Sequence, residues 1–105
     1  MEDSNAQNQP RYIISVAAVM ASCHPQTLRH YERVGLVTPQ RTKGNVRLYT
    51  YEDIEQAQRI QRLMDDLGVN LAGVEIILHM RQQILSLQEQ LSQLQARLEP
   101  SDPGV

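Results

Sequence analysis

The feature that most constrains this chain is a stretch from Val74 to Glu99 that contains no glycine and no proline. Large apolar residues recur along it at alternating steps of three and four. They are Ile77, Met80, Ile84, Leu87, Leu91, Leu94 and Leu98. This spacing draws one apolar stripe along a helix and is typical of a coiled coil. We therefore expect a long C-terminal helix whose apolar stripe must be buried against another surface.

A second copy of the same helix is the expected cover, because isolated helices of about 15 residues are marginal in water. The predicted dimer seam consists of Ile84, Leu87, Leu91, Leu94 and Leu98. The alternative is that the helix folds back on its own domain. The unbroken stretch offers no turn for such a return, which favours the dimer.

Two short helices are predicted earlier in the chain, after a possible strand at residues 12–14. Ser15 has the side chain of a good N-cap for the first of them. Val16, Val19 and Met20 fall on one face of that helix and are predicted to be buried. The following segment, residues 22–24, breaks the helix as a tight turn.

The second helix begins at Pro25, which suits the first helical position because its missing N–H has no intrahelical partner there. It is expected to run to about Val34, with Gly35 as a left-handed C-cap. Two short helices joined by so tight a turn have the spacing of a helix-turn-helix, whose second helix enters the major groove of DNA.

Residues 36–49 lack a helical period and are expected to form two short strands around a Lys43-Gly44-Asn45 turn. Thr50 is predicted to cap a third helix that ends at Gly68. Its apolar face would be Ile54, Ala57, Ile60, Met64 and Leu67. Asn70 is predicted to cap the last helix, with Leu71, Val74 and Ile77 pointing inward.

The second short helix carries the candidate DNA-reading side chains. Leu28 and Tyr31 lie three residues apart and point toward the first helix, which leaves a polar face on the other side. That face carries Gln26, Arg29, His30 and Arg33. Arginine can bind guanine through two hydrogen bonds, glutamine can bind adenine, and both reach phosphates. A solvated polar face on an ordinary amphipathic helix is the alternative.

The predicted hairpin strengthens the DNA interpretation, because Arg47 and Tyr49 are two apart on a strand and share one face. A cation and a phenol beside a reading helix suit the sugar-phosphate backbone. Arg41 and Lys43 extend the basic rim. Charge is divided accordingly: residues 11–50 hold six bases and one acid, whereas residues 51–105 hold four bases and nine acids. Such a division indicates a basic half that faces phosphates.

Three stretches together resemble the DNA-binding domain of the MerR family over roughly residues 12 to 80. They are Ile14–Ala17, Thr27–Val37 and Arg47–Tyr49. Within that family, His24–Arg29 and Gly68–Val74 are similar to the HspR group of heat-shock repressors. The resemblance implies a mainly α fold, in which a winged helix-turn-helix DNA-binding domain precedes a C-terminal dimerisation helix, an antiparallel coiled coil.

The resemblance also implies repression of chaperone genes from inverted-repeat operators, with the Hsp70 chaperone DnaK as co-repressor and with no nucleotide, metal or drug as ligand. The second helix would meet the major groove while Arg47 and Tyr49 clamp flanking phosphates. The predicted DNA-binding set is Gln26, Thr27, Arg29, His30, Tyr31, Arg33, Lys43, Arg47 and Tyr49. A chaperone modulator that binds a DnaJ-like co-chaperone, or a DNA-architecture factor, would be the alternative functions.

The expected organisation is a flexible arm (1–11), the DNA-binding domain (12–80), the coiled-coil helix (81–99) and a disordered tail (100–105). The start of the chain is polar and acidic, unlike a signal peptide, and no apolar run approaches 18 residues, so a cytoplasmic protein is expected. Cys23 is the single cysteine and makes a poor metal site alone. No nucleophile–base spacing or phosphate loop indicates an enzyme.

Overall fold

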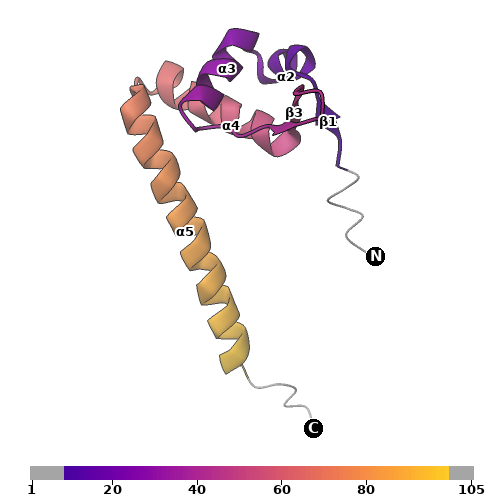
Figure 1. The fold of residues 1–105 in the computed structure, drawn as a ribbon. Helices are drawn as coiled ribbons and strands as arrows, with labels where there is room; N and C mark the ends of the chain where they lie inside the picture. Colours follow the sequence, from indigo (N-terminus) through magenta and orange to yellow (C-terminus); the bar gives the residue numbers. More distant parts are fainter. Residues whose placement is uncertain (1–8, 100–105) are drawn as a thin grey trace. The chain divides into compact units, whose positions relative to one another are not determined.

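The computed structural model describes residues 9–99, and the chain divides into two compact units, residues 1–69 and 70–105. The predicted tail, and most of the predicted arm, lie outside the described residues. The element order is a short strand, two short helices, two further strands, a third helix that continues into a π-helical turn, and one long helix (Figure 1). The prediction of a mainly α chain with a hairpin between helices is confirmed.

The first helix, α2, spans Ile14–Ala21 and is capped by backbone alone. The predicted cap at Ser15 is wrong: Ile13 is the extended N-cap residue, and its carbonyl accepts from the backbone N–H groups of Val16 and Ala17 at 3.1 and 2.9 Å. Ser15 therefore already lies in the first turn and is exposed.

The buried face of α2 is made of alanine, contrary to the prediction. Ala17, Ala18 and Ala21 are at most 2% exposed, whereas Val19 is 78% exposed and Val16 43%. Helix α2 packs against two other helices of its unit, and a methyl side chain lets helix backbones approach closely, where the β-branched valine would hold them apart. The larger apolar residues consequently face outward.

The second helix, α3, spans Pro25–Arg33 and follows a turn in which Ser22 is left-handed, with φ 59°. His24 is the N-cap residue, and its Nδ1 accepts from the backbone N–H of Gln26 at 3.1 Å. The helix ends at Arg33 with Val34 as its C-cap residue, and Gly35 follows with a φ of 82°, which favours glycine. The predicted positions of the proline and of the glycine cap are confirmed.

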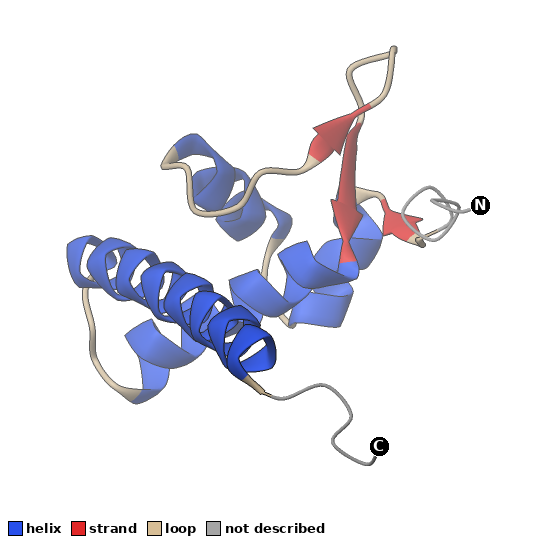
Figure 2. Ribbon diagram, turned by 90° about the horizontal axis from the view of Figure 1, so that it is seen from below, coloured by secondary structure: helices blue, strands red, loops and turns tan. Residues whose placement is uncertain are grey.

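A three-stranded antiparallel sheet follows the order β1-β3-β2, with β1 at Arg11–Tyr12, β2 at Gln40–Arg41 and β3 at Arg47–Thr50. Figure 2 shows the hairpin of β2 and β3 extending beyond the helices of its unit. The turn between them closes through the backbone N–H of Asn45, which donates to the carbonyl of Thr42 at 2.9 Å. The predicted wing is confirmed, while the first strand begins one residue before the predicted position.

The third helix, α4, spans Tyr51–Gln61 and begins with a capping box. The Thr50 hydroxyl accepts from the backbone N–H of Asp53 at 3.1 Å, and the Asp53 carboxylate accepts from the backbone N–H of Thr50 at 2.9 Å. Ile54, Ala57 and Ile60 are buried as predicted.

A π-helical turn, η1 at Arg62–Asp66, continues α4 and changes the direction in which the following side chains point. The backbone N–H of Leu67 donates to the carbonyl of Arg62, five residues back, at 3.2 Å. The wider turn rotates the residues that follow it away from an α-helical register. Leu67 is therefore 71% exposed, and its predicted place on the buried face is wrong.

The long helix, α5, spans Leu71–Leu98, and the Asn70 side chain caps it by accepting from the backbone N–H of Gly73 at 2.8 Å. Val74 is buried as predicted, but Leu78 and not Ile77 accompanies it, since Ile77 is 36% exposed. Among the described residues, no helix is long and apolar enough to cross a membrane.

Candidate nucleic-acid interface

The outward face of α3 presents the polar side chains that the sequence places there. Gln26, His30 and Arg33 are exposed, and Arg29 is half-buried. Neighbouring turns are linked, because Arg29 Nη1 donates to Gln26 Oε1 at 3.4 Å and Arg33 Nη2 lies 3.2 Å from His30 Nδ1. Leu28 occupies the opposite face with no exposed surface. The helix therefore displays a continuous row of donors and acceptors.

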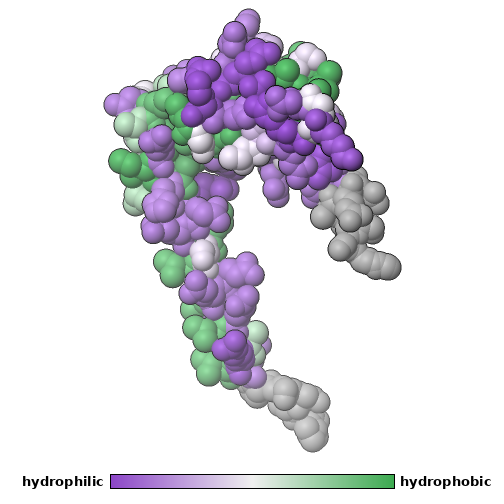
Figure 3. Space-filling view, viewed as in Figure 1, coloured by the Kyte–Doolittle hydropathy of each residue, from purple (hydrophilic) through white to green (hydrophobic). Residues whose placement is uncertain are grey.

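The wing brings a second set of cations to the same side of the unit. Lys43 is exposed in the turn, and Arg41 and Arg47 are paired neighbours across β2 and β3. Figure 3 shows hydrophilic side chains gathered over this unit. A basic helix face beside a basic hairpin is suited to phosphate contacts on both sides of a groove.

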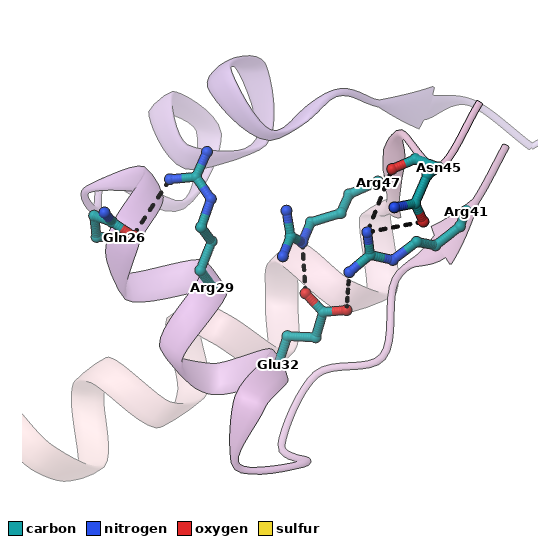
Figure 4. A network of polar contacts seen from close by, with 6 residues as sticks. All are labelled: Gln26, Arg29, Glu32, Arg41, Asn45 and Arg47. Atoms are coloured by element: carbon teal, nitrogen blue, oxygen red, sulfur yellow. Dashed lines mark hydrogen bonds and ion pairs between the residues drawn. The ribbon is translucent and has the colours of Figure 1, made fainter.

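Glu32 joins α3 to the wing (Figure 4). Its Oε1 accepts from Arg47 Nε at 2.5 Å and its Oε2 from Arg41 Nη2 at 3.0 Å. Arg41 Nη1 then donates to the backbone carbonyl and side-chain oxygen of Asn45, at 3.3 and 3.2 Å. One carboxylate thus ties α3 to both strands of the hairpin and, through Arg41, to its turn.

The sequence interpretation missed Glu32, which it counted only as the one acid in residues 11–50. Its position as the one acid in a basic stretch was the sequence feature that could have identified it. An acid within a basic stretch, three residues after Arg29 on the reading helix, stands where it can pair with several cations at once. Its partners lie 9 and 15 residues away, and so helix periodicity did not reveal them.

Pairing changes the titration of both charged partners. Partial burial acts to raise the pKa of Glu32, but hydrogen bonds and charge from Arg47 and Arg41 outweigh it and hold that pKa below its ordinary value of 4.5. The hydrogen bond to Glu32 raises the pKa of Arg47 in turn. Glu32 and Arg47 are therefore both charged at neutral pH.

A cleft of about 250 Å³ lies between α3 and the wing. Its lining consists of Arg29, Glu32, Arg33, Arg41 and Arg47. Four guanidinium groups around one carboxylate leave an excess of positive charge in this cleft. A cleft with such an excess attracts anions, and arginine is suited to phosphate because its planar donors match phosphate oxygens.

Two tyrosines of the predicted DNA-binding set lie inside the unit. Tyr31 is 5% exposed and Tyr49 has no exposed surface, whereas the resemblance implied that Tyr31 meets the major groove and that Tyr49 clamps a phosphate. Tyr49 pairs with Tyr12 of β1, whereas Arg47 pairs with Arg41 at the hairpin end of β3. Burial raises the pKa of both phenols. Within residues 9–99 the buried Tyr49 hydroxyl has no hydrogen-bond partner.

The remaining members of the predicted set differ in accessibility. Thr27 is half-buried, and its backbone N–H donates to the carbonyl of His24 in the first turn of α3. Cys23 is half-buried, and burial raises the pKa of its thiol. Over the described residues, no group of three or more His, Cys, Asp or Glu side chains could hold a metal ion.

The predicted seam residues lie exposed along α5. The exposed fractions run from 51% for Leu94 to 82% for Leu98. The others are Ile84 at 53%, Leu91 at 56% and Leu87 at 62%. An apolar groove at the first half of the helix continues the stripe, lined by Ile77, Met80, Arg81, Ile84 and Leu85. Figure 3 shows the hydrophobic stripe along this helix.

Comparison with known proteins identifies relatives over most of the chain. The family described as "MerR HTH family regulatory protein" matches residues 12–81. A protein of Streptomyces coelicolor described as "Putative heat shock protein HspR" is 45% identical over 93 residues, which are 89% of this chain and 62% of that protein. The "HTH-type transcriptional regulator GlnR" of Bacillus anthracis is 33% identical over 76 residues, 72% of this chain and 58% of the relative. The chain thus spans about 60% of the length of these relatives.

Solved structures share the fold. A structure described as "HiNmlR, a MerR family regulator lacking the sensor domain, bound to promoter DNA" aligns with a TM-score of 0.63 and 23% identity, over 85% of this chain and 79% of that one. A transcriptional regulator of the same family from Bacillus cereus aligns with a TM-score of 0.56 and 26% identity, over 83% and 76% of the two chains. The Bacillus anthracis relative and the second structural neighbour are described as transcriptional regulators, and the first structural neighbour as a regulator bound to promoter DNA.

Proposed function

Because the chain belongs to the MerR family of helix-turn-helix regulatory proteins, we propose that it is a sequence-specific DNA-binding repressor of heat-shock chaperone genes. The observation that carries the proposal is the exposed polar face of α3 beside the basic wing, with four arginines around one cleft. This function needs access to the chromosome and therefore assigns the protein to the cytoplasm.

Base reading falls to the exposed face of α3, and backbone contacts fall to its C-terminal end and the wing. We assign Gln26, Thr27, Arg29 and His30 to the major groove, since all four lie on α3 and are exposed or half-buried. Arg33, Lys43 and Arg47 are assigned to phosphates. The buried Tyr31 and Tyr49 support this surface from inside the unit.

Operator binding by a homodimer follows from the exposed stripe of α5. Five large apolar side chains more than half exposed on one helix are an unfavourable surface in water, and a second copy of the helix covers them. Family resemblance implies antiparallel packing. Two-fold symmetry then matches an inverted-repeat operator, because each half-site is read by one subunit.

The heat-shock role is proposed from the relative in Streptomyces coelicolor, with which the chain shares 45% identity. The proposed co-repressor, DnaK, would tighten operator binding, and unfolded proteins would titrate the chaperone away during stress. The heat response then becomes a matter of coupled binding equilibria.

Selection from random DNA duplexes by the full chain, followed by binding at several salt concentrations, tests the proposal. An enriched inverted repeat is expected, with affinity that falls steeply as salt rises. Arg29→Ala is expected to cost about 1 to 3 kcal/mol on the selected site and to relax one base position. Arg47→Ala is expected to weaken all sequences alike. Arg62→Ala removes the same charge from an exposed position outside the interface and serves as control.

Two results would remove the proposal. The first is a failure of the wild type to enrich any sequence, which would favour a protein-binding function such as that of a chaperone modulator. The second is equal binding by the wild type and the doubly substituted Arg29→Ala, Arg47→Ala protein. Footprinting of the enriched site with and without DnaK tests the co-repressor separately, and an unchanged footprint counts against it.

A further inference from the structure

We propose that Glu32 is a positioning residue, which fixes Arg41 and Arg47 relative to the reading helix and thereby sets how strongly the protein discriminates its operator from other DNA. The inference rests on the proposed DNA-binding function and adds to it a residue that makes no attractive contact with DNA. A carboxylate on a DNA-facing surface repels phosphate, so its presence at the centre of the cleft calls for a role other than affinity.

The geometry leaves the arginines usable while it holds them. Arg47 meets Glu32 through Nε, which leaves the outer edge of its guanidinium, with Nη1 and Nη2, for a phosphate. Arg41 meets Glu32 through Nη2 and reaches Asn45 through Nη1. Each cation is thus anchored by part of its donor set and keeps the rest, because a guanidinium carries five N–H donors.

Because Glu32 anchors the wing arginines to α3, the contacts with bases and the contacts with phosphates are made by one rigid surface. Glu32 lies on α3 in the turn that follows Arg29, so the phosphate-facing arginines move with the helix that faces the bases. On the operator, base contacts and phosphate contacts can form together without a further loss of side-chain freedom, which favours binding. On other sequences, a fixed wing cannot move independently to compensate for poor base contacts.

The same carboxylate lowers attraction to DNA of any sequence. It offsets part of the charge of Arg41 and Arg47, whose side chains are 35% and 27% exposed. Removal of the charge frees these long side chains to follow any phosphate. Loss of Glu32 is therefore expected to raise non-specific affinity and to reduce the advantage of the operator, which is the opposite of a uniform weakening.

Glu32→Gln in the full chain tests the inference, with binding measured to the selected operator duplex and to a scrambled duplex of equal composition. We expect tighter binding to the scrambled duplex and a roughly 10-fold smaller ratio of operator to scrambled affinity, the size of one charge-assisted hydrogen bond. The salt dependence on scrambled DNA is expected to steepen by up to about 0.9 per added phosphate contact. A merely structural role of Glu32 would not steepen it.

Glu75→Gln is the matched control, since it removes the same charge from an exposed position on α5, and its ratio is expected to equal that of the wild type. Glu32→Asp keeps the charge but shortens the reach by one methylene. It is expected to bind scrambled DNA as the wild type does and still to lose discrimination, and its thermal unfolding curve checks that the unit is folded.

The outcomes separate the two proposals. A wild type that enriches no sequence removes the DNA-binding function itself. A wild type that selects an operator, together with a Glu32→Gln protein whose affinities for operator and scrambled DNA change by the same factor, overturns the role of Glu32 and leaves the function standing. A Glu32→Asp protein that matches the wild type in both affinities would show that charge alone is involved, and would likewise overturn positioning.

Discussion

Lysine in place of Leu87 and Leu94 is expected to turn the dimer into a folded monomer. The two leucines lie seven residues apart on α5 and are 62% and 51% exposed. Full burial of a leucine side chain is worth about 1.5 to 3 kcal/mol, and slightly more than half of each remains to be covered. A dimer contains four such side chains, so their removal costs roughly 3 to 6 kcal/mol before any penalty for lysine in the seam.

Dimerisation does not gain the whole of this burial free energy, because ordering the side chains at an interface costs free energy. We therefore expect the lower end, a dimer dissociation constant at least about 100-fold weaker. Sedimentation over a range of concentrations measures it, and circular dichroism reports whether the first unit stays folded. Affinity for the selected operator is expected to fall as the dimeric fraction of the protein falls.

The matched control places the same two charges one residue earlier on the helix, as Ser86→Lys with Gln93→Lys. These positions turn away from the seam by about 100°, so the control is expected to remain dimeric. If the Leu87→Lys, Leu94→Lys protein still sediments as a dimer and binds its operator at wild-type affinity, then the seam lies elsewhere and the reasoning from exposure fails.

Three other perturbations have defined outcomes. Thr50→Ala removes the side-chain half of the capping box on α4, and urea denaturation is expected to show a loss of about 1 kcal/mol, so an unchanged midpoint would show that the cap adds nothing. The lowered pKa of Glu32 makes its stabilising contribution complete above pH 4.5 and lost as the pH falls through the folded value. Unfolding curves of wild type and Glu32→Gln should therefore differ at pH 6 and converge as the pH falls below the folded pKa of Glu32, and a constant difference would refute this linkage. The raised pKa of Cys23 predicts slower alkylation by iodoacetamide at pH 8 than in an unstructured cysteine peptide, and equal rates would contradict the burial of the thiol.

Local signals in the sequence located the helices and the hairpin because single residues specify those features. A proline cannot occupy most helical positions, and Pro25 stands at the one that tolerates it. Gly35 and the caps at Thr50 and Asn70 mark where helices end and begin. The polar face of α3 followed directly from the spacing of its buried residues.

Features that depend on contacts between distant segments were not predictable in this way. Hydropathy ranks Val19 above Ala18, yet the space between packed helices admits only the alanine. Strand alternation placed Tyr49 beside Arg47 but carried no information about the helices that pack against β3, where the tyrosine is buried. The partners of Glu32, Arg41 and Arg47, lie beyond the end of α3 on the hairpin. A periodic pattern within one helix therefore cannot identify them.

The π-helical turn at Arg62–Asp66 makes this part of the chain unusually permissive of a change in length. A π turn holds one residue more than an α turn, so the loss of one residue there would restore regular i→i−4 hydrogen bonds and leave the flanking residues on their present faces. Elsewhere in α4 the same deletion would rotate everything beyond it by about 100° and carry Ile54 or Ile60 out of the core. Among relatives of this chain, we expect single-residue gaps in α4 and its continuation to fall within these five positions.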